Sequence, residues 1–447
     1  MVSPVQIVGG GLAGSEASRV LAAAGIPVCL VEMRPQATTG AHETDDLAEI
    51  VCSNSLGSIV LTTAKGVLIE ELRRLGSLII AVAEQHAVPA GASLAVNRRE
   101  FSQDITSRLM NESLVEIERE EVMSVPPGPV LIATGPLTGD SLASSLKEMT
   151  GEEHLAFYDS IAPIVTADSI DRDVVYAASR YGRGDPDYLN CPFSEEQYGQ
   201  LVEELLTADT APLKDFEEAA FFEGCLPVEE MARRGPQTLA FGPMRPVGLE
   251  DPRTGRRPHA VVQLRSEDRH GQLFNLVGFQ TKLTYSEQQR VFRLIPGLED
   301  AVFVRLGSVH RNTFINAPAL LAPDLSLRSQ NDVWFGGLVA GTEGYAECAA
   351  LGLMAALSIR ARLMDRPFEP PPRTTMIGGL MAYLREADVE HFQPMNVQFG
   401  LLPPLEKKVS GRKAKRAALA DRALSDLDGW ITQQDLGWLA EKPVAID

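Results

Sequence analysis

The sequence predicts an α/β protein: a Rossmann-like, dinucleotide-binding domain with a parallel sheet, an inserted α+β domain and a helical C-terminal segment. Three observations support this fold class. The chain opens with an apolar run, a glycine-rich turn and a small-residue helix; its middle is richer in proline, aromatic residues and short strands; and mostly helical sequence follows residues 370–372, which are all proline. At 447 residues, of which 45% are hydrophobic and 23% charged, the chain is long enough for two or three domains with a large core.

The first elements predict a βαβ unit. Residues 4–8 form a short apolar run, which predicts a strand, and residues 15–24 are small or apolar, which predicts a helix. Gly25 ends that helix, and residues 26–31 predict a second buried strand that stops at Glu32. A crossover of this length joins two parallel strands.

Further apolar runs continue the same plan. The patterns predict helices over residues 63–75, 99–109 and 343–362, and strands over residues 114–117, 130–133, 260–264, 273–277 and 332–338. We therefore expect residues 1–150 to form the first part of the dinucleotide-binding domain and residues 151–296 an inserted domain that faces the substrate. Residues 297–447 would supply the second part of the dinucleotide-binding domain, with the C-terminal helices.

The glycine-rich turn after the first strand predicts a dinucleotide site. Gly9, Gly11 and Gly14 follow the spacing GxGxxG between a strand and a helix, and in this context the motif indicates dinucleotide binding. Gly9 permits the tight turn, Gly11 lets the backbone approach a pyrophosphate, and Gly14 allows the helix to pack closely on the strand. The helix N-terminus attracts phosphates, and Glu32 is placed to accept hydrogen bonds from ribose hydroxyls. The predicted cofactor-binding residues here are Gly9, Gly10, Gly11, Leu12, Ala13, Gly14 and Glu32.

Two later segments favour FAD over NAD as the bound dinucleotide. The strand at residues 130–133 runs into Thr134 and Gly135, a pattern that resembles the second signature of two-dinucleotide-type flavoproteins. A glycine-rich segment before a helix resembles their C-terminal signature, in which a helix N-terminus faces the flavin. Its candidate contacts are Gly337, Thr342, Glu343 and Gly344. The sequence has no second complete GxGxxG, so a nicotinamide reductant, NADH or NADPH, would bind only transiently.

Five cysteines are scattered through the chain without CxxC spacing, which argues against a zinc site and against a disulfide framework. We predict no metal site. Cys52 and Cys225 lie in turns rich in polar residues or in glycine and proline, where a thiol can be activated to attack an electrophilic carbon. Cys29, in a buried strand, and Cys191 and Cys348 are interpreted as structural.

The charge of the chain bears on its partners and location. A net charge of −19 and a pI near 4.9 disfavour a nucleic-acid partner at long range and favour a small-molecule enzyme. Basic residues gather locally, however, since six of the ten residues 407–416 are Lys or Arg. Such a run is either a solvated face or a surface that neutralises phosphates. The sequence lacks both an apolar run long enough to cross a bilayer and a signal peptide, so we expect a cytoplasmic protein without membrane contact.

Read in order, the motifs resemble the bacterial folate- and FAD-dependent tRNA (uracil-C5-) methyltransferases, the TrmFO family. A longer tRNA wobble-uridine modifying flavoprotein shares the general plan, but it carries an extra C-terminal helical domain and a different sequence around its cysteines. The segments that carry the resemblance run nearly the whole length of the chain: GGGLAGSEA, VCSNSLGS, PAGASLAVNRREFS, IATGPLTGDSLA, SRYGRGDPDYLNCPFSEEQY, FFEGCLPVEEMARRGPQTLAFGPMRPVGLEDPRTG, NLVGFQTKL, QRVFRLIPGLE and HRNTFINAP.

The resemblance implies an activity and roles for three residues. It implies methylation of the T-loop uridine at tRNA position 54, with carbon from 5,10-methylenetetrahydrofolate and electrons from NAD(P)H through FAD. A nucleophile at uracil C6 would give C5 carbanion character, which makes Cys52 and Cys225 a candidate pair of nucleophile and acid/base, with the two roles unassigned. His310 is similar to the imidazole that stacks on the folate pterin. The sequence departs from the family pattern at Asn97, where Asp is usual, and at Leu338, where Gln is usual.

The residues alone leave two other classes of function open. A flavin oxidoreductase acting on a small molecule would suit the acidic charge. A noncatalytic FAD- or folate-binding module that docks on RNA or protein would need no reactive thiol. A methylation assay discriminates among the three.

Overall fold

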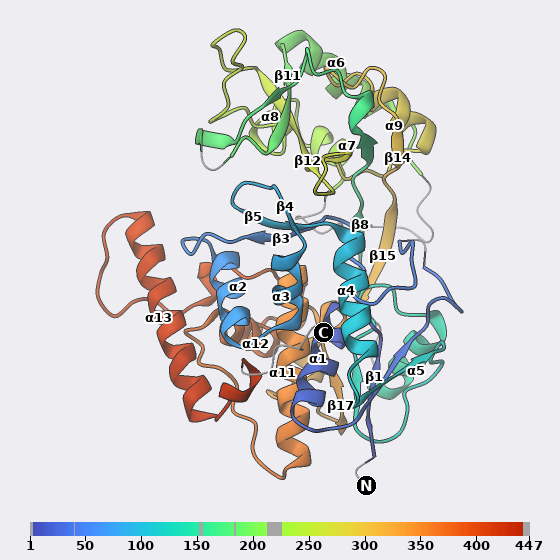
Figure 1. Cartoon of the computed structure of the whole chain (residues 1–447), viewed down its shortest axis with the longest axis vertical. Coiled ribbons are helices and arrows are strands. Elements are labelled where there is room, and N and C mark those ends of the chain that lie inside the picture. Colours follow the sequence, from blue (N-terminus) through green and yellow to red (C-terminus); the bar gives the residue numbers. More distant parts are fainter. Residues whose placement is uncertain (1–2, 40, 152–154, 183–184, 212–225, 441–447) are drawn as a thin grey trace.

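A computed structural model describes residues 3–39, 41–151, 155–182, 185–211 and 226–440, with the backbone alone at residues 155–160 and 309–312. The described chain forms two lobes (Figure 1). The larger lobe, lower in Figure 1, holds the N-terminal (blue) and C-terminal (orange and red) parts of the chain, and the smaller lobe holds the middle (green and yellow). Each lobe has its own hydrophobic core.

The larger lobe is built on a six-stranded sheet with the spatial order β16–β17–β7–β1–β2–β6. β16 pairs antiparallel with β17, and the remaining pairs are parallel. This arrangement confirms the predicted α/β class and its parallel sheet. The strands are β1 (Val5–Val8), β2 (Val28–Glu32), β6 (Val115–Arg119), β7 (Val130–Ile132), β16 (Ser326–Leu327) and β17 (Gln330–Phe335).

Helices surround this sheet and extend to the C-terminal end of the described chain. α1 packs closely on α11, where a Cβ added to Gly352 would lie 2.2 Å from the Ala13 carbonyl oxygen, so only glycine allows this approach. A small sheet of β3 (Ser55–Ser58), β5 (Ser93–Val96) and β4 (Ala87–Val88) caps this lobe toward the smaller one. The helices are α1 (Leu12–Ala23), α2 (Ala64–Arg74), α3 (Leu78–Gln85), α4 (Arg98–Met110), α5 (Asp140–Thr150), α10 (Ala317–Leu320), α11 (Tyr345–Leu363), α12 (Met376–Glu386) and α13 (Arg412–Gln433).

The smaller lobe is the inserted α+β unit. Its sheet has the order β10–β11–β12–β13–β9–β14, with antiparallel pairs throughout. The strands are β9 (Ile164–Thr166), β10 (Tyr176–Ala177), β11 (Tyr188–Phe193), β12 (Ala260–Ser266), β13 (Leu273–Leu276) and β14 (Phe303–Arg305), and the helices are α6 (Glu195–Thr207), α7 (Val228–Arg233), α8 (Thr238–Phe241) and α9 (Tyr285–Phe292).

Two antiparallel strands connect the lobes. β8 (Leu155–Ser160) leads into the smaller lobe, and β15 (Val309–Phe314) returns beside it (Figure 1). β14, which pairs with β9, still belongs to the smaller lobe, so that lobe's sheet extends past residue 296. Phe314 already packs in the core of the larger lobe.

The observed bounds differ from the predicted ones where backbone conformation overrides the apolar pattern. α1 begins at Leu12 rather than at residue 15, because the last residues of the glycine-rich turn already form its first turn. β17 ends at Phe335 rather than at residue 338, because Gly337 takes a φ of 75° and a 3₁₀ turn (Leu338–Ala340) follows. Among the described residues, none of the helices is both long and apolar enough to span a bilayer.

Candidate active site

A cavity of about 340 Å³ lies in the larger lobe, beyond the carboxyl ends of β1, β2 and β7. β1 has β2 on one side and β7 on the other, so the cavity is at the point where the strand order reverses, the usual ligand site in such sheets. Most of the predicted cofactor residues line this cavity, and Cys52 lines it too. They are Gly9, Gly11, Leu12, Ala13, Glu32, Thr134, Gly135, Gly337, Glu343 and Gly344.

The three glycines of the GxGxxG turn meet three different constraints. Gly9 has a φ of 105°, and a Cβ there would lie 2.5 Å from the Ala133 carbonyl oxygen. A Cβ on Gly14 would lie 1.9 Å from the carbonyl oxygen of Gly9, so α1 can approach the turn only with glycine at this position. A Cβ on Gly11 would meet nothing within 4 Å. Gly11 therefore leaves open space at the N-terminus of α1, where main-chain N–H groups can bind a phosphate.

Glu32, at the end of β2, presents a fixed carboxylate to the cavity. Its Oε2 accepts a hydrogen bond from the Gly10 N–H at 2.8 Å, and its Oε1 accepts one from Arg34 Nε at 2.7 Å. Burial by itself would raise the pKa of Glu32, but the hydrogen bonds and charge of Arg34, with the Gly10 N–H, hold that pKa below its ordinary value. Glu32 is therefore ionised at neutral pH and can accept hydrogen bonds from ribose hydroxyls.

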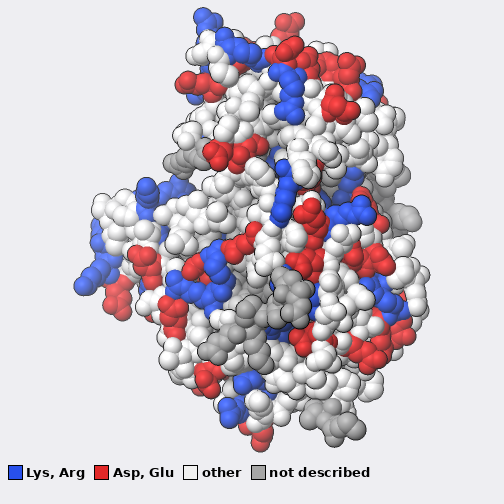
Figure 2. All heavy atoms as spheres, in the orientation of Figure 1, with Lys and Arg blue, Asp and Glu red and all other residues white. Residues whose placement is uncertain are grey.

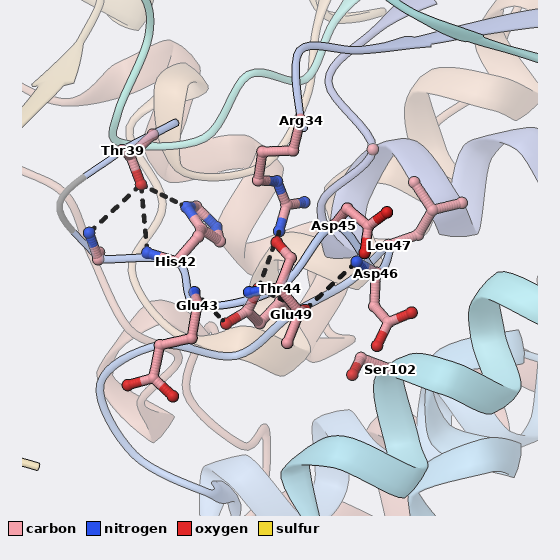
Figure 3. A network of polar contacts seen from close by, with 12 residues as sticks. Arg34, Thr39, His42, Glu43, Thr44, Asp45, Asp46, Leu47, Glu49 and Ser102 are labelled. Carbon is pink, nitrogen blue, oxygen red and sulfur yellow. Dashed lines mark hydrogen bonds and ion pairs between the residues drawn. The ribbon is translucent and has the colours of Figure 1, made fainter. Parts of the chain in front are cut away.

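The loop after β2 folds around Glu49 and closes one side of the cavity (Figure 3). Arg34 Nη1 donates to Glu49 Oε2 at 2.9 Å, and the main-chain N–H groups of Glu43 and Thr44 donate to the two carboxylate oxygens of Glu49. Arg34, His42 and Glu49 line the cavity. The sequence patterns did not single out this loop, because its contacts depend on side chains rather than on a repeating pattern.

A second helix N-terminus, that of α11, faces the same cavity. Gly344 precedes it with a φ of 104°, and a Cβ there would lie 2.4 Å from Glu347 Oε2 and 2.8 Å from Lys65 Nζ. Lys65 Nζ forms an ion pair with Glu347 Oε2 and also lines the cavity. Two helix N-termini thus open onto the same cavity, and their unpaired main-chain N–H groups suit an anionic group of a ligand.

Cys52 faces Tyr345, the first residue of α11. The Cys52 Sγ and the Tyr345 Oη lie 2.9 Å apart, and the main-chain N–H groups of Cys52 and Ser53 donate to the same Oη at 3.0 and 3.1 Å. Two N–H donors occupy both lone pairs of the phenol oxygen, so the phenol proton is directed at the sulfur. Burial, and after it negative charge at Cys52, raises the pKa of Tyr345 well above its ordinary value. The phenol therefore keeps its proton beside the sulfur.

Two arginines hold the Cys52 loop against the smaller lobe. Arg98, on α4, donates from Nη1 to the Ile50 carbonyl oxygen at 3.0 Å and pairs through Nε with Glu267 Oε2 at 2.6 Å. Arg265, on β12, donates from Nη2 to Ser53 Oγ at 2.8 Å. These side-chain pairs are 169 and 212 positions apart in the sequence, so local sequence patterns could not indicate them.

Several predicted residues do not line the cavity or lie outside the part of the chain that the structure describes. Gly10 and Gly14 are buried and do not line the cavity, and Thr342 is buried with its Oγ1 donating to the Met395 carbonyl oxygen at 3.3 Å. The backbone of His310 is part of β15, opposite residue 159 of β8, but its side chain is outside the described atoms. Cys225 lies outside the described residues.

The remaining described cysteines are protonated thiols at neutral pH. Burial, with help from nearby glutamates, raises the pKa of Cys29 to about 11, and burial raises the pKa of Cys191 and of Cys348 further. Cys348 nevertheless lines the cavity, a position that its helix of small residues did not indicate.

The two departures from the family pattern have clear positions. Asn97 Oδ1 accepts the Glu100 N–H at 3.3 Å and caps α4, a role that Asp also fills. Leu338 lines the cavity as an apolar side chain, so it makes the wall there less polar than a glutamine would. Within the described ranges, no group of three or more His, Cys, Asp or Glu side chains is arranged to hold a metal ion.

Comparison with known proteins assigns the family. A family model described as "Glucose inhibited division protein A" matches residues 4–367. A protein of Geobacter sulfurreducens named methylenetetrahydrofolate--tRNA-(uracil-5-)-methyltransferase TrmFO is 56% identical over 435 residues, which cover 96% of this chain and 99% of that protein. A Listeria monocytogenes protein of the same name is 52% identical over 425 residues, which cover 95% of this chain and 98% of that protein.

Among solved structures, Aquifex aeolicus GidA in its form I crystal aligns with a TM-score of 0.70 over 98% of this chain and 78% of that chain. At 16% identity this similarity shows the fold alone. The family model and the curated relatives each cover most of the sequence. The chain therefore belongs to the glucose inhibited division protein A family and, within it, to the group of proteins named TrmFO.

Proposed function

We propose that this protein methylates the T-loop uridine at tRNA position 54 to 5-methyluridine, with 5,10-methylenetetrahydrofolate as carbon donor and FAD, reduced by NAD(P)H, as cofactor. The observation that carries the proposal is the Cys52–Tyr345 pair on the wall of a cavity suited to a dinucleotide. Relatives that are 52–56% identical and named for this reaction support it. Access to tRNA and folate fits the cytoplasmic location that we expect.

The residues around the cavity fit FAD. Gly11 leaves room for a pyrophosphate at the N-terminus of α1, and Glu32 offers an ionised carboxylate to ribose hydroxyls. The N-terminus of α11 faces the same cavity, where it would stabilise negative charge on a bound flavin. When bound, FAD reduced by NAD(P)H would supply the electrons that convert the transferred one-carbon unit into a methyl group.

The chain must provide a nucleophile for uracil C6 and a base for the C5 proton. Addition of a thiolate to C6 makes C5 nucleophilic, and C5 bonds to the one-carbon unit. A base then removes the C5 proton as the carrier of that unit leaves, and reduction of the unit to a methyl group releases the thiolate from C6. Tyr345 places a phenol oxygen 2.9 Å from the Cys52 Sγ, which gives this sulfur a neighbour with which it can exchange a proton. We therefore assign the acid/base role to Cys52, with Tyr345 as its proton partner, and the nucleophile role to Cys225.

The other site residues follow from the resemblance. His310 would stack on the folate pterin, and the inserted domain of residues 151–296 would face the tRNA. The hydrogen bond from Arg265 to Ser53 supports the second assignment, because it connects the inserted domain to the loop that carries Cys52. A bound tRNA that shifts this domain would thereby reposition the thiol. The uridine itself would have to leave the folded T-loop to reach the cavity.

The test is a direct assay of product. Purified, flavin-loaded protein is incubated with unmodified tRNA transcript, 5,10-methylenetetrahydrofolate and NADPH, and nucleosides are analysed by mass spectrometry. We expect 5-methyluridine from the natural transcript and none from a control transcript with cytidine at position 54. Absence of product together with rapid NADPH oxidation by a small acceptor would favour a flavin oxidoreductase instead. Absence of any turnover would favour a noncatalytic binding module.

A further inference from the structure

A second cavity, of about 880 Å³, lies apart from the one that holds Cys52. It is a groove bounded by four regions: the segment between β3 and α2, the turn between β4 and β5, the loop around Tyr181 in the smaller lobe, and the first turns of α13. Its volume is within the range of sites that bind organic ligands. The residues that line this groove are Val60, Thr62, Gly91, Ala92, Tyr181, Arg412, Lys413 and Arg416.

The wall formed by α13 is positive. Arg412 and Lys413 are exposed, and the Arg416 guanidinium lies 5.8 Å from the centre of the Phe399 ring. Over the part of the chain that the structure describes, Arg412, Lys413 and Arg416 form no ion pair, whereas an exposed arginine such as Arg290 pairs with glutamates. Figure 2 shows blue side chains gathered at the outer edge of the larger lobe, where α13 begins. In a chain with 60 acidic and 41 basic residues, this local positive charge favours a polyanionic partner.

The wall formed by the smaller lobe carries an exposed aromatic ring. Tyr181 is 58% exposed and has a φ of 60°, a left-handed conformation that is uncommon for residues other than glycine. Its N–H donates to the Gly248 carbonyl oxygen at 2.8 Å, and its ring lies against Gly248, where an added Cβ would come within 2.8 Å of ring carbons. The preceding Arg180 is anchored by hydrogen bonds to Gln263 and to the Val247 carbonyl oxygen. The loop thus holds the ring in a defined position at the groove.

We propose that this groove binds a strand of the tRNA substrate, with backbone phosphates on Arg412, Lys413 and Arg416 and a nucleobase stacked on Tyr181. Cations along one wall and an aromatic platform on the other are the two features by which proteins hold single-stranded nucleic acid without reading its sequence. An acidic peptide would satisfy the cations but would gain little from the ring. The inference rests on the proposed tRNA substrate and adds a contact region away from the reactive cysteine.

The test separates the two walls of the groove. The charge-reversed variant R412E/K413E, the variants Tyr181→Asn and Tyr181→Phe, and a control variant Arg366→Glu are compared for binding of a fluorescent tRNA transcript at several salt concentrations. Asn accepts a positive φ more readily than most residues, so Tyr181→Asn removes the ring with the least backbone strain. Arg366 is exposed beyond the end of α11, outside the groove.

We expect charge reversal to weaken binding and to lower the slope of log K against log salt by about 0.7–0.9 for each lost phosphate contact. Tyr181→Asn should weaken binding by about 5- to 100-fold, Tyr181→Phe should bind nearly as the natural protein does, and Arg366→Glu should have no effect. Normal affinity and salt slope in both R412E/K413E and Tyr181→Asn would overturn the proposal. A loss with charge reversal but none with Tyr181→Asn would exclude stacking and favour a general polyanion site.

Two further measurements distinguish this inference from the proposed function. Flavin content and the rate of flavin reduction by NADPH should be the same in all variants, because the groove is apart from the cofactor cavity. A natural protein that binds tRNA through this groove yet forms no 5-methyluridine would refute the proposed activity and leave the groove assignment intact.

Discussion

Replacement of Tyr345 by phenylalanine removes one oxygen atom from the centre of the Cys52 site. That oxygen lies 2.9 Å from the Cys52 Sγ and accepts the main-chain N–H groups of Cys52 and Ser53. A buried donor without a partner costs about 1–3 kcal/mol, and water from the adjoining cavity can replace part of the loss. We therefore expect the variant to lose about 1–3 kcal/mol of unfolding free energy in total and to remain folded.

The effect on catalysis should be larger than the effect on stability. Without the phenol, Cys52 loses the group that holds a proton beside its sulfur. A positioned acid or base contributes about 10²- to 10⁴-fold to the rate of a proton-transfer step, so we expect single-turnover methylation to slow by about 100-fold or more. The pH dependence of that rate should also change, because the Tyr345 phenol, whose pKa is raised well above its ordinary value, would no longer supply a proton to the site.

The assay is single-turnover formation of 5-methyluridine at saturating tRNA, measured across pH, with flavin content and tRNA affinity determined separately. Tyr383→Phe is a matched control, since it also removes a hydroxyl that is hydrogen-bonded to the main chain, here as a donor to the Gln393 carbonyl oxygen (2.6 Å), but outside the cavity. A Tyr345→Phe variant with the natural rate and an unchanged pH profile would refute the assignment of Tyr345 as the proton partner of Cys52.

Two further predictions concern stability and cofactor binding. Burial raises the pKa of Glu71 to about 8, while hydrogen bonds from the Met376 and Ile377 N–H groups oppose that shift, so the folded protein binds this proton more tightly than the unfolded chain does. The unfolding free energy should fall as the pH rises from about 5 to about 8, and Glu71→Gln should flatten that part of the curve in denaturant titrations; an unchanged slope would contradict this. Gly11→Val should lose bound flavin and unfold at the same temperature as the flavin-free natural protein, whereas Gly14→Ala should lose flavin and unfold at a lower temperature, because only the second substitution collides with the backbone; a Gly11→Val protein with full flavin content would show that the space at Gly11 is not needed by the cofactor.

Local patterns were sufficient to predict the glycine-rich turn that lines the cavity. The turn at Gly9, Gly11 and Gly14 is specified by backbone conformation and by contacts within one βαβ unit, so the spacing of three glycines carries the information. The parallel sheet was equally predictable, because buried strands appear as continuous apolar runs. The ends of strands and helices were harder to predict. Gly337 ends β17 through its own backbone conformation, which the apolar pattern did not indicate.

The sequence by itself thus determined the α/β class, the glycine loop, the carboxylate of Glu32 and, through its motifs, Cys52 as a candidate reactive thiol. Only the tertiary structure decided what surrounds that thiol. Tyr345 lies 293 positions from Cys52, and Arg265 lies 212 positions from the Ser53 side chain that it contacts. Contacts of this kind depend on how the two lobes and the helix N-termini pack together. They produce no regular pattern in the sequence, because a hydrogen bond between distant side chains constrains their positions in space and not their spacing along the chain.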